Sequence, residues 1–100
     1  DLQDPIPYKV SLHQNFPNPF NPITQIKITT DKISKGVLMI FDVNGSSIIT
    51  LYNGFLLPGE TLIPWDGRDH VGKIVATGTY FYSLFVDGEL IESNSMIFIK

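Results

Sequence analysis

The chain has 100 residues, 43% of them hydrophobic and 17% charged, which predicts a single globular domain with one modest core and excludes a second domain. Its formal net charge is −3 and its seven basic residues are scattered, so a nucleic-acid partner is not expected. The absence of cysteine excludes disulfides and thiolate metal sites, and no apolar run approaches the roughly 20 residues that span a bilayer.

A polar, proline-containing lead over residues 1–7 is interpreted as the remnant of a linker in a longer protein. Turn residues then divide residues 8–100 into short segments rich in β-branched and aromatic residues, without helical periodicity. These segments predict an all-β fold, a single immunoglobulin-like antiparallel β-sandwich over residues 8–100. We predict its seven strands over residues 8–13, 24–30, 36–43, 47–52, 60–65, 79–86 and 89–99.

Residues 15–22, called the proline box below, contain three prolines alternating with asparagines and two phenylalanines. Each proline fixes its own φ, lacks an amide donor and pushes the preceding residue toward an extended conformation. The box is therefore predicted to be a stiff, extended connector that is anchored to the domain. Because a rigid loop holds aromatic rings at small entropic cost, both Phe16 and Phe20 are expected to pack back onto the sandwich.

Two dipeptides, Asn44-Gly45 and Asp87-Gly88, lie between apolar runs and tolerate positive φ at both positions, which predicts type I′ hairpins. Pro58-Gly59 predicts a third turn. Residues 24–30 alternate apolar and polar side chains and therefore predict a strand with one buried face. Residues 37–41, by contrast, are apolar at every position, and their periodicity does not show whether both faces are covered.

The loop that begins at Trp65 carries two carboxylates, Asp66 and Asp69, three residues apart. A calcium site is one interpretation, but a hard cation needs six to eight oxygens and the spacing is not that of an EF-hand. We favour a structural interpretation in which Asp66 accepts backbone amides to hold a tight turn, Gly67 and Gly72 adopt angles that other residues avoid, and Trp65 closes one end of the core.

No set of residues predicts catalysis or a cofactor. His13 and His70 lie on different segments, no nucleophile motif accompanies them, and most carboxylates stand beside predicted turns. Trp65, Tyr80 and Tyr82 have rings that a sugar can stack on, but a domain of this size needs its large rings for the core, so we favour core filling.

Three features together resemble the type A C-terminal sorting domain of proteins exported by the bacterial type IX secretion system. They are the Asn-Pro-Phe-Asn-Pro core of the proline box, the Trp-Asp-Gly loop, and the apolar final segment over residues 96–100. The central hairpin is also similar to that of the immunoglobulin-like domain of the flagellar hook-capping protein. The structural positions that carry the resemblance are Asn18, Pro19, Phe20, Asn21, Pro22, Trp65, Asp66, Gly67, Gly78 and Tyr80.

The resemblance implies a non-catalytic address that folds in the periplasm. Such a domain is recognised by the outer-membrane translocon or its shuttle proteins, and a sortase-like peptidase removes it and attaches the N-terminal passenger to a surface lipopolysaccharide. The localisation implied is export through the periplasm to the outer-membrane surface or the extracellular space. The alternative is an accessory immunoglobulin-like spacer or glycan-binding module of an extracellular enzyme or adhesin.

The final segment, residues 96–100, is the expected recognition element. A terminal strand at a sheet edge leaves amides and carbonyls unpaired, and a partner can extend it by adding a strand. We expect the partner to read this backbone edge together with the outward side chains of Ile97, Ile99 and Lys100, while Met96 and Phe98 fill the core.

Overall fold

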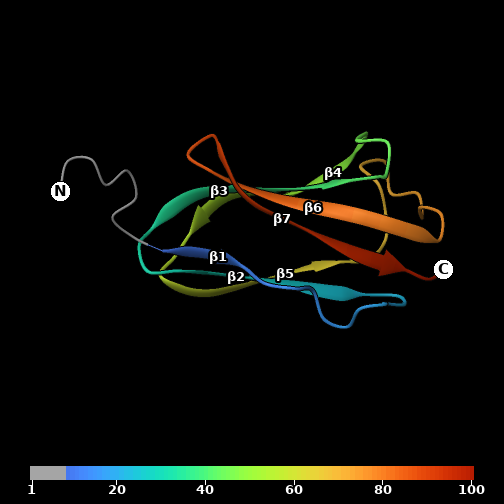
Figure 1. Ribbon diagram of the computed structural model, residues 1–100, viewed down its shortest axis with the longest axis horizontal. Helices are drawn as coiled ribbons and strands as arrows, with labels where there is room; N and C mark the ends of the chain where they lie inside the picture. Colours follow the sequence, from blue (N-terminus) through green and yellow to red (C-terminus); the bar gives the residue numbers. More distant parts are fainter. Residues whose placement is uncertain (1–8) are drawn as a thin grey trace.

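The computed structural model describes residues 9–100, over which seven antiparallel strands form the two layers of a β-sandwich (Figure 1). One layer has the strand order β1-β2-β5 and comprises β1 (Val10–Leu12), β2 (Thr24–Thr30) and β5 (Gly59–Trp65). The other has the order β4-β3-β6-β7 and comprises β3 (Ser34–Phe41), β4 (Ser47–Leu56), β6 (Gly78–Val86) and β7 (Glu89–Phe98). The all-β prediction is confirmed. The lead over residues 1–7, and residue 8, where the first predicted strand begins, lie outside the described residues.

Several strand ends differ from those predicted. β3 ends at Phe41 rather than at residue 43, because the carboxylate of Asp42 accepts the backbone amides of Asn44 and Ser46, both at 2.9 Å, and so begins the turn early. β4 continues to Leu56, beyond the predicted end at residue 52, because it pairs with β3 along its whole length.

The two predicted hairpins are present, but only one has the predicted turn. Asp87 and Gly88 both have positive φ, 51° and 84°, as a type I′ turn requires. In the other hairpin only Gly45 has positive φ, and its amide donates to the carbonyl of Asp42 at 3.0 Å. The side chain of Asp42 therefore imposes a different turn, in which Gly45 alone takes the left-handed position.

The core lies between the two sheets and is filled by alternate residues of each strand. Ile26 and Ile28 of β2 are buried, as the alternation in the sequence predicts. At the end of the sandwich where β5 stops, four aromatic rings pack together with centroid separations of 5.0–6.3 Å; they belong to Phe20, Trp65, Tyr80 and Phe98. Core filling by Trp65, Tyr80 and Tyr82 is thus confirmed.

The apolar run over residues 37–41 lies in the middle of its sheet, between β4 and β6. Leu38 and Ile40 are fully buried and point into the sandwich. Val37 and Met39 are half-buried on the outer face, where they pair with Phe85 and Ser83 of β6. The inner face of the run is therefore buried in the core, and its outer face is half-buried. Residues 9–100 contain no helix with the length and apolar character that a membrane crossing requires.

Candidate recognition site

The proline box is joined to the end of β7 backbone to backbone. The amide of Phe20 donates to the carbonyl of Ile97 at 3.0 Å, and the amide of Ile99 donates to the carbonyl of Phe20 at 3.1 Å. The side-chain oxygen of Asn18 accepts the amide of Ile97 at 2.9 Å. Gln14, which precedes the box, also binds this edge of β7, because its side-chain amide nitrogen donates to the carbonyl of Ser95 at 2.8 Å. The expectation of an open backbone edge over residues 96–100 is therefore wrong, since the proline box already occupies that edge.

The side chains of the terminal segment alternate as the sequence predicts. Met96 and Phe98 are 1% and 3% exposed and belong to the core, whereas Ile97 and Ile99 are 44% and 46% exposed. Lys100 is exposed, and its backbone amide donates to the hydroxyl of Thr77 at 2.8 Å. A partner at this edge can therefore read outward side chains, but it cannot add a strand there without displacing the box.

The two phenylalanines of the proline box have opposite surroundings. Phe20 is 2% exposed and packs against Phe98, with ring centroids 5.0 Å apart. Phe16 is 80% exposed, so the expectation that both rings pack onto the sandwich is wrong for Phe16. The box is anchored, as predicted, but it bends through residues 17–19 and 21–22 instead of running extended. Pro19, Asn21 and Pro22 are exposed on these bends.

Asn15 is a structural residue that the sequence analysis did not identify. It is 2% exposed, and its side-chain nitrogen donates to the hydroxyl of Thr24 at 2.9 Å and to the carbonyl of Pro17 at 3.1 Å. Its backbone amide donates to the hydroxyl of Tyr82 at 2.8 Å. A signal was present in the sequence, since an asparagine side chain often hydrogen-bonds to the backbone two residues on, which here is Pro17.

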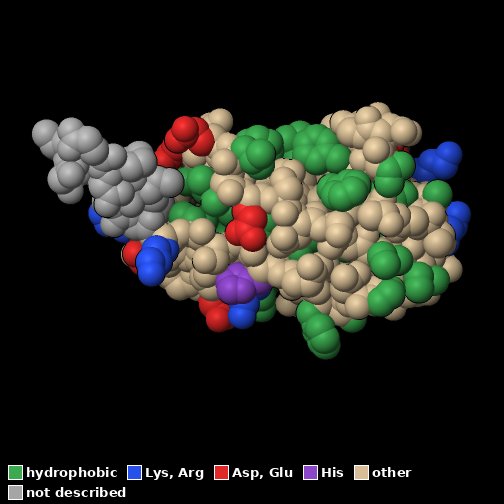
Figure 2. All heavy atoms as spheres, in the orientation of Figure 1, with side chains coloured by type: hydrophobic (Ala, Val, Ile, Leu, Met, Phe, Trp, Pro, Cys, Tyr) green, Lys and Arg blue, Asp and Glu red, His purple; other side chains and the backbone are tan. Residues whose placement is uncertain are grey.

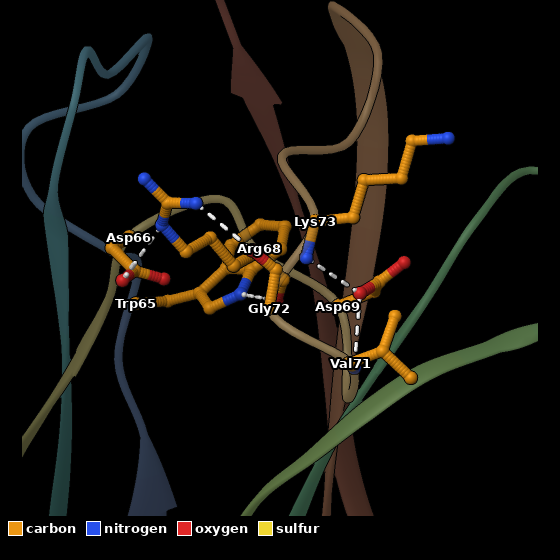
Figure 3. A network of polar contacts seen from close by, with 7 residues as sticks. All are labelled: Trp65, Asp66, Arg68, Asp69, Val71, Gly72 and Lys73. Carbon is orange, nitrogen blue, oxygen red and sulfur yellow. Dashed lines mark hydrogen bonds and ion pairs between the residues drawn. The ribbon is translucent and has the colours of Figure 1, made fainter.

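The Trp-Asp-Gly loop is held by its own polar contacts (Figure 3). The indole nitrogen of Trp65 donates to the carbonyl of Arg68 at 2.9 Å, and the guanidinium of Arg68 donates to the carbonyl of Gly72 at 2.9 Å. Gly67 has a φ of 76°, and a Cβ on it would lie 2.7 Å from the ring of Phe98. The glycine is therefore required both by its backbone angle and by the close approach of the terminal strand.

The structural interpretation of the loop holds, but the carboxylate that performs it is Asp69. One oxygen of Asp69 accepts the amides of Val71 and Lys73, both at 3.0 Å. Asp66 lies 3.6 Å from the Arg68 guanidinium, and no backbone amide within residues 9–100 donates to it. The hydrogen bond from the Lys73 amide is the main cause that holds the pKa of Asp69 below its ordinary value of 3.8. Within residues 9–100, no three His, Cys, Asp or Glu side chains gather in a way that could hold a metal ion.

The two remaining motif residues lie at the start of β6. The hydroxyl of Tyr80 donates to the carbonyl of Ala76 at 2.6 Å, and burial raises the pKa of Tyr80 above 10.0. Gly78 has no heavy atom within 4 Å of the position that a Cβ would take, so nothing in the structure explains a glycine there.

Beside the terminal segment, a mainly apolar hollow of about 300 Å³ opens between the proline box and the Trp-Asp-Gly loop. Phe98 contributes to its lining, and Ile23 and Ile74, which also line it, are 49% and 38% exposed. Arg68 and Lys100 are basic lining residues. Apolar and basic side chains gather at the end of the molecule that carries the C-terminus (Figure 2). Of the three expected recognition residues, Lys100 lines this hollow.

The fold was compared with known proteins. No protein-family model matches the sequence, and no curated protein sequence matches it. The structure is similar to part of dimeric latent PorU from Porphyromonas gingivalis, with a TM-score of 0.78 and 21% identity over 94% of this chain and 10% of that one. It is also similar to part of the alkylpurine DNA glycosylase AlkC from Pseudomonas fluorescens bound to DNA with an abasic site analog, with a TM-score of 0.59 and 16% identity over 91% of this chain and 30% of that one. The chain thus spans a small share of both proteins, and at these identities the similarity shows the fold.

Proposed function

We propose that residues 8–100 are a non-catalytic C-terminal sorting domain that addresses an attached N-terminal passenger to the type IX secretion translocon. On this proposal the protein is exported, passes through the periplasm and reaches the outer-membrane surface or the extracellular space. Its partners are the translocon or its shuttle proteins and a sortase-like peptidase.

The observation that carries the proposal is the fold similarity to PorU, a sortase-like protein of type IX secretion. The similarity covers nearly the whole of this chain and only a tenth of PorU, which fits a module that is joined to larger proteins. The sequence supports the same function independently, through the proline box, the Trp-Asp-Gly loop and the apolar terminal segment.

We place recognition on side chains rather than on a free backbone edge. The box and the terminal segment share hydrogen bonds, so a partner meets them as one surface. Ile97 and Ile99 present nearly half of their side-chain area to solvent there, and Lys100 adds a positive charge. Burying two isoleucines is favourable enough to anchor a transient contact, and the lysine favours an acidic partner surface.

A fusion tests the sorting function directly. Residues 1–100, joined behind a neutral reporter with a general export leader, should bring the reporter to the surface of a type IX-competent host. A host strain without the translocon should retain it in the periplasm. The proposal would be contradicted if the competent host retained the reporter fusion in the periplasm while a known sorting domain was exported normally in parallel.

A second set of variants separates recognition from folding. Replacing Ile97 and Ile99 with threonine should keep the melting temperature and lower the surface yield, because β-branched residues retain strand preference. The matched control replaces Ile33 and Leu57 with threonine. These residues are 61% and 62% exposed and lie outside the terminal segment, so the surface yield should be unchanged. Deleting residues 98–100 should lower stability and yield together. Equal yields in the two double variants would contradict a recognition role for the terminal segment.

A further inference from the structure

The exposed ring of Phe16 is held by a rigid backbone. The amide and carbonyl of Phe16 exchange hydrogen bonds of 3.0 Å with those of Gln25 on β2. The preceding residue, Asn15, is buried and bonded on its backbone and side chain. A phenyl ring that is 80% exposed forgoes the stabilisation that burial would give it, and here it does so from a backbone with little freedom to move. A rigid, exposed ring of this kind is suited to contact a ligand at small entropic cost.

The ring borders an open groove of about 500 Å³ on the outer face of the β1-β2-β5 sheet. Strand register places its polar and apolar walls side by side, because Lys27 of β2 lies opposite Leu62 of β5. The lining comprises His13, Gln14, Phe16, Gln25, Lys27 and Leu62.

The polar lining residues have hydrogen-bonding capacity to spare. Within residues 9–100, no hydrogen bond involves the side-chain amide of Gln25, which both donates and accepts. Gln14 uses its amide nitrogen on Asn15 and Ser95, which leaves its amide oxygen as an acceptor. His13 uses one ring nitrogen on the hydroxyl of Thr29 at 3.1 Å and has a second nitrogen.

The groove has little net charge. Its one formally charged lining residue, Lys27, has its ammonium 3.7 Å from a carboxylate oxygen of Glu60. A single cation already facing a carboxylate does not favour a phosphate or a polyanion. Two amides and an imidazole around exposed apolar carbon instead match a ligand that is neutral, has apolar faces and both donates and accepts hydrogen bonds.

We propose that this groove binds a neutral saccharide, with the apolar C–H face of one pyranose ring against Phe16 and Leu62. Hydroxyl groups of the sugar exchange hydrogen bonds with Gln25, Gln14 and His13, because hydroxyls and amides each donate and accept. The groove includes Phe16 of the proline box but lies on the outer face of the β1-β2-β5 sheet, and the proposal does not rest on the sorting function. An open groove with a single ring as its platform implies weak binding, with a Kd on the order of 1 mM.

The test is an amide NMR titration of the 100-residue chain with three neutral probes: cellohexaose, xylohexaose and mannohexaose, each to about 10 mM. At least one probe should produce saturable shifts at Gln14, Gln25 and Leu62. The variant Phe16→Ala should weaken that binding at least about tenfold, since it removes the platform.

The control variant is Phe81→Ala, because Phe81 is 39% exposed on the other sheet, and it should bind as the parent does. The melting temperatures of both variants are measured to check that each is folded. Absence of saturable shifts with all three probes, shifts centred on another face, or equal binding by Phe16→Ala and the parent would overturn the proposal. Selective binding of an acidic probe, oligogalacturonate, would overturn the assignment to a neutral ligand.

Discussion

The hydroxyl of Tyr82 accepts the backbone amide of Asn15 at 2.8 Å, and this hydrogen bond ties the start of the proline box to the centre of the opposite sheet. The same hydroxyl donates to the carbonyl of His13, also at 2.8 Å. The buried hydroxyl of Tyr82 thus hydrogen-bonds to the backbone of the residues on either side of Gln14. These two bonds fix the position of the backbone where the proline box begins.

Replacing Tyr82 with phenylalanine should lower the free energy of unfolding by about 1–3 kcal/mol, because the amide of Asn15 is left buried without a partner. Urea denaturation measures the change. The control is Tyr52→Phe, whose hydroxyl donates to the exposed carbonyl of Phe55 and should matter by less than about 1 kcal/mol. Equal losses of unfolding free energy in the two variants would show that the hydrogen bonds of Tyr82 stabilise the protein no more than the exposed hydrogen bond of Tyr52 does.

The two rings of the proline box should differ sharply on truncation. Phe20→Ala should cost about 3–5 kcal/mol, because it opens a cavity beside Trp65 and Phe98. Phe16→Ala should stay within about 0.5 kcal/mol of the parent, since its ring is mostly in solvent. Chemical denaturation midpoints check both, and a large loss at Phe16 would contradict its observed exposure.

Alkaline pH should destabilise the fold through the buried phenols. Burial raises the pKa of Tyr80 and Tyr82 above 10.0, so the unfolded chain loses these protons at lower pH than the folded protein does. The stability that comes from keeping the phenols neutral is fully present below pH 10 and is lost as pH rises through the folded pKa values. Unfolding free energies measured across this range should fall less steeply in Tyr82→Phe than in the parent. Parallel curves for the two proteins would refute the linkage.

Two glycines of the Trp-Asp-Gly loop should respond differently to alanine. Gly67→Ala combines a φ of 76° with a Cβ placed 2.7 Å from the ring of Phe98, so a loss of about 3 kcal/mol is expected. Gly72→Ala has a φ of 87° but open space around its Cβ, and should lose only about 1 kcal/mol. Thermal unfolding of both variants decides between these effects, and similar losses would mean that contact with Phe98 is easily relieved.

Acid should release the loop at the carboxylate of Asp69. Because the amide hydrogen bonds hold its pKa below 3.8, their contribution is present above pH 3.8 and is lost as pH falls through the lowered pKa. The amide resonances of Val71 and Lys73 should therefore titrate together with a midpoint below 3.8, and Asp69→Asn should abolish that titration. A midpoint at or above 3.8 would contradict the assignment.

Local patterns in the sequence predicted the parts of the fold that depend on neighbouring residues. Ile26 and Ile28 alternate with polar residues and are both buried, and Asp87-Gly88 forms the predicted turn. The hairpin at Asn44-Gly45 was predicted, but its turn type was not, because the side chain of Asp42 accepts the amides of Asn44 and Ser46 and changes the turn.

Long-range pairing decided what local patterns could not. Phe16 and Phe20 have nearly the same proline-rich surroundings in the sequence, and only Phe20 meets the distant terminal strand. That same pairing closes the edge that the sequence predicts to be free. Likewise, Asp66 and Asp69 are equivalent candidates by spacing, and the backbone path of the loop brings amides to Asp69 alone.

The junction between Phe20 and Phe98 has a consequence for the order of folding. These residues are 78 positions apart, and their rings close one end of the core together with Trp65. Domains dominated by such distant contacts fold slowly, because chain entropy is lost before the contacts form. A nascent chain cannot complete this core until β7 has been synthesised, so folding of residues 9–100 is completed only after the last strand has been translated. A natively folded domain therefore indicates that translation has passed β7.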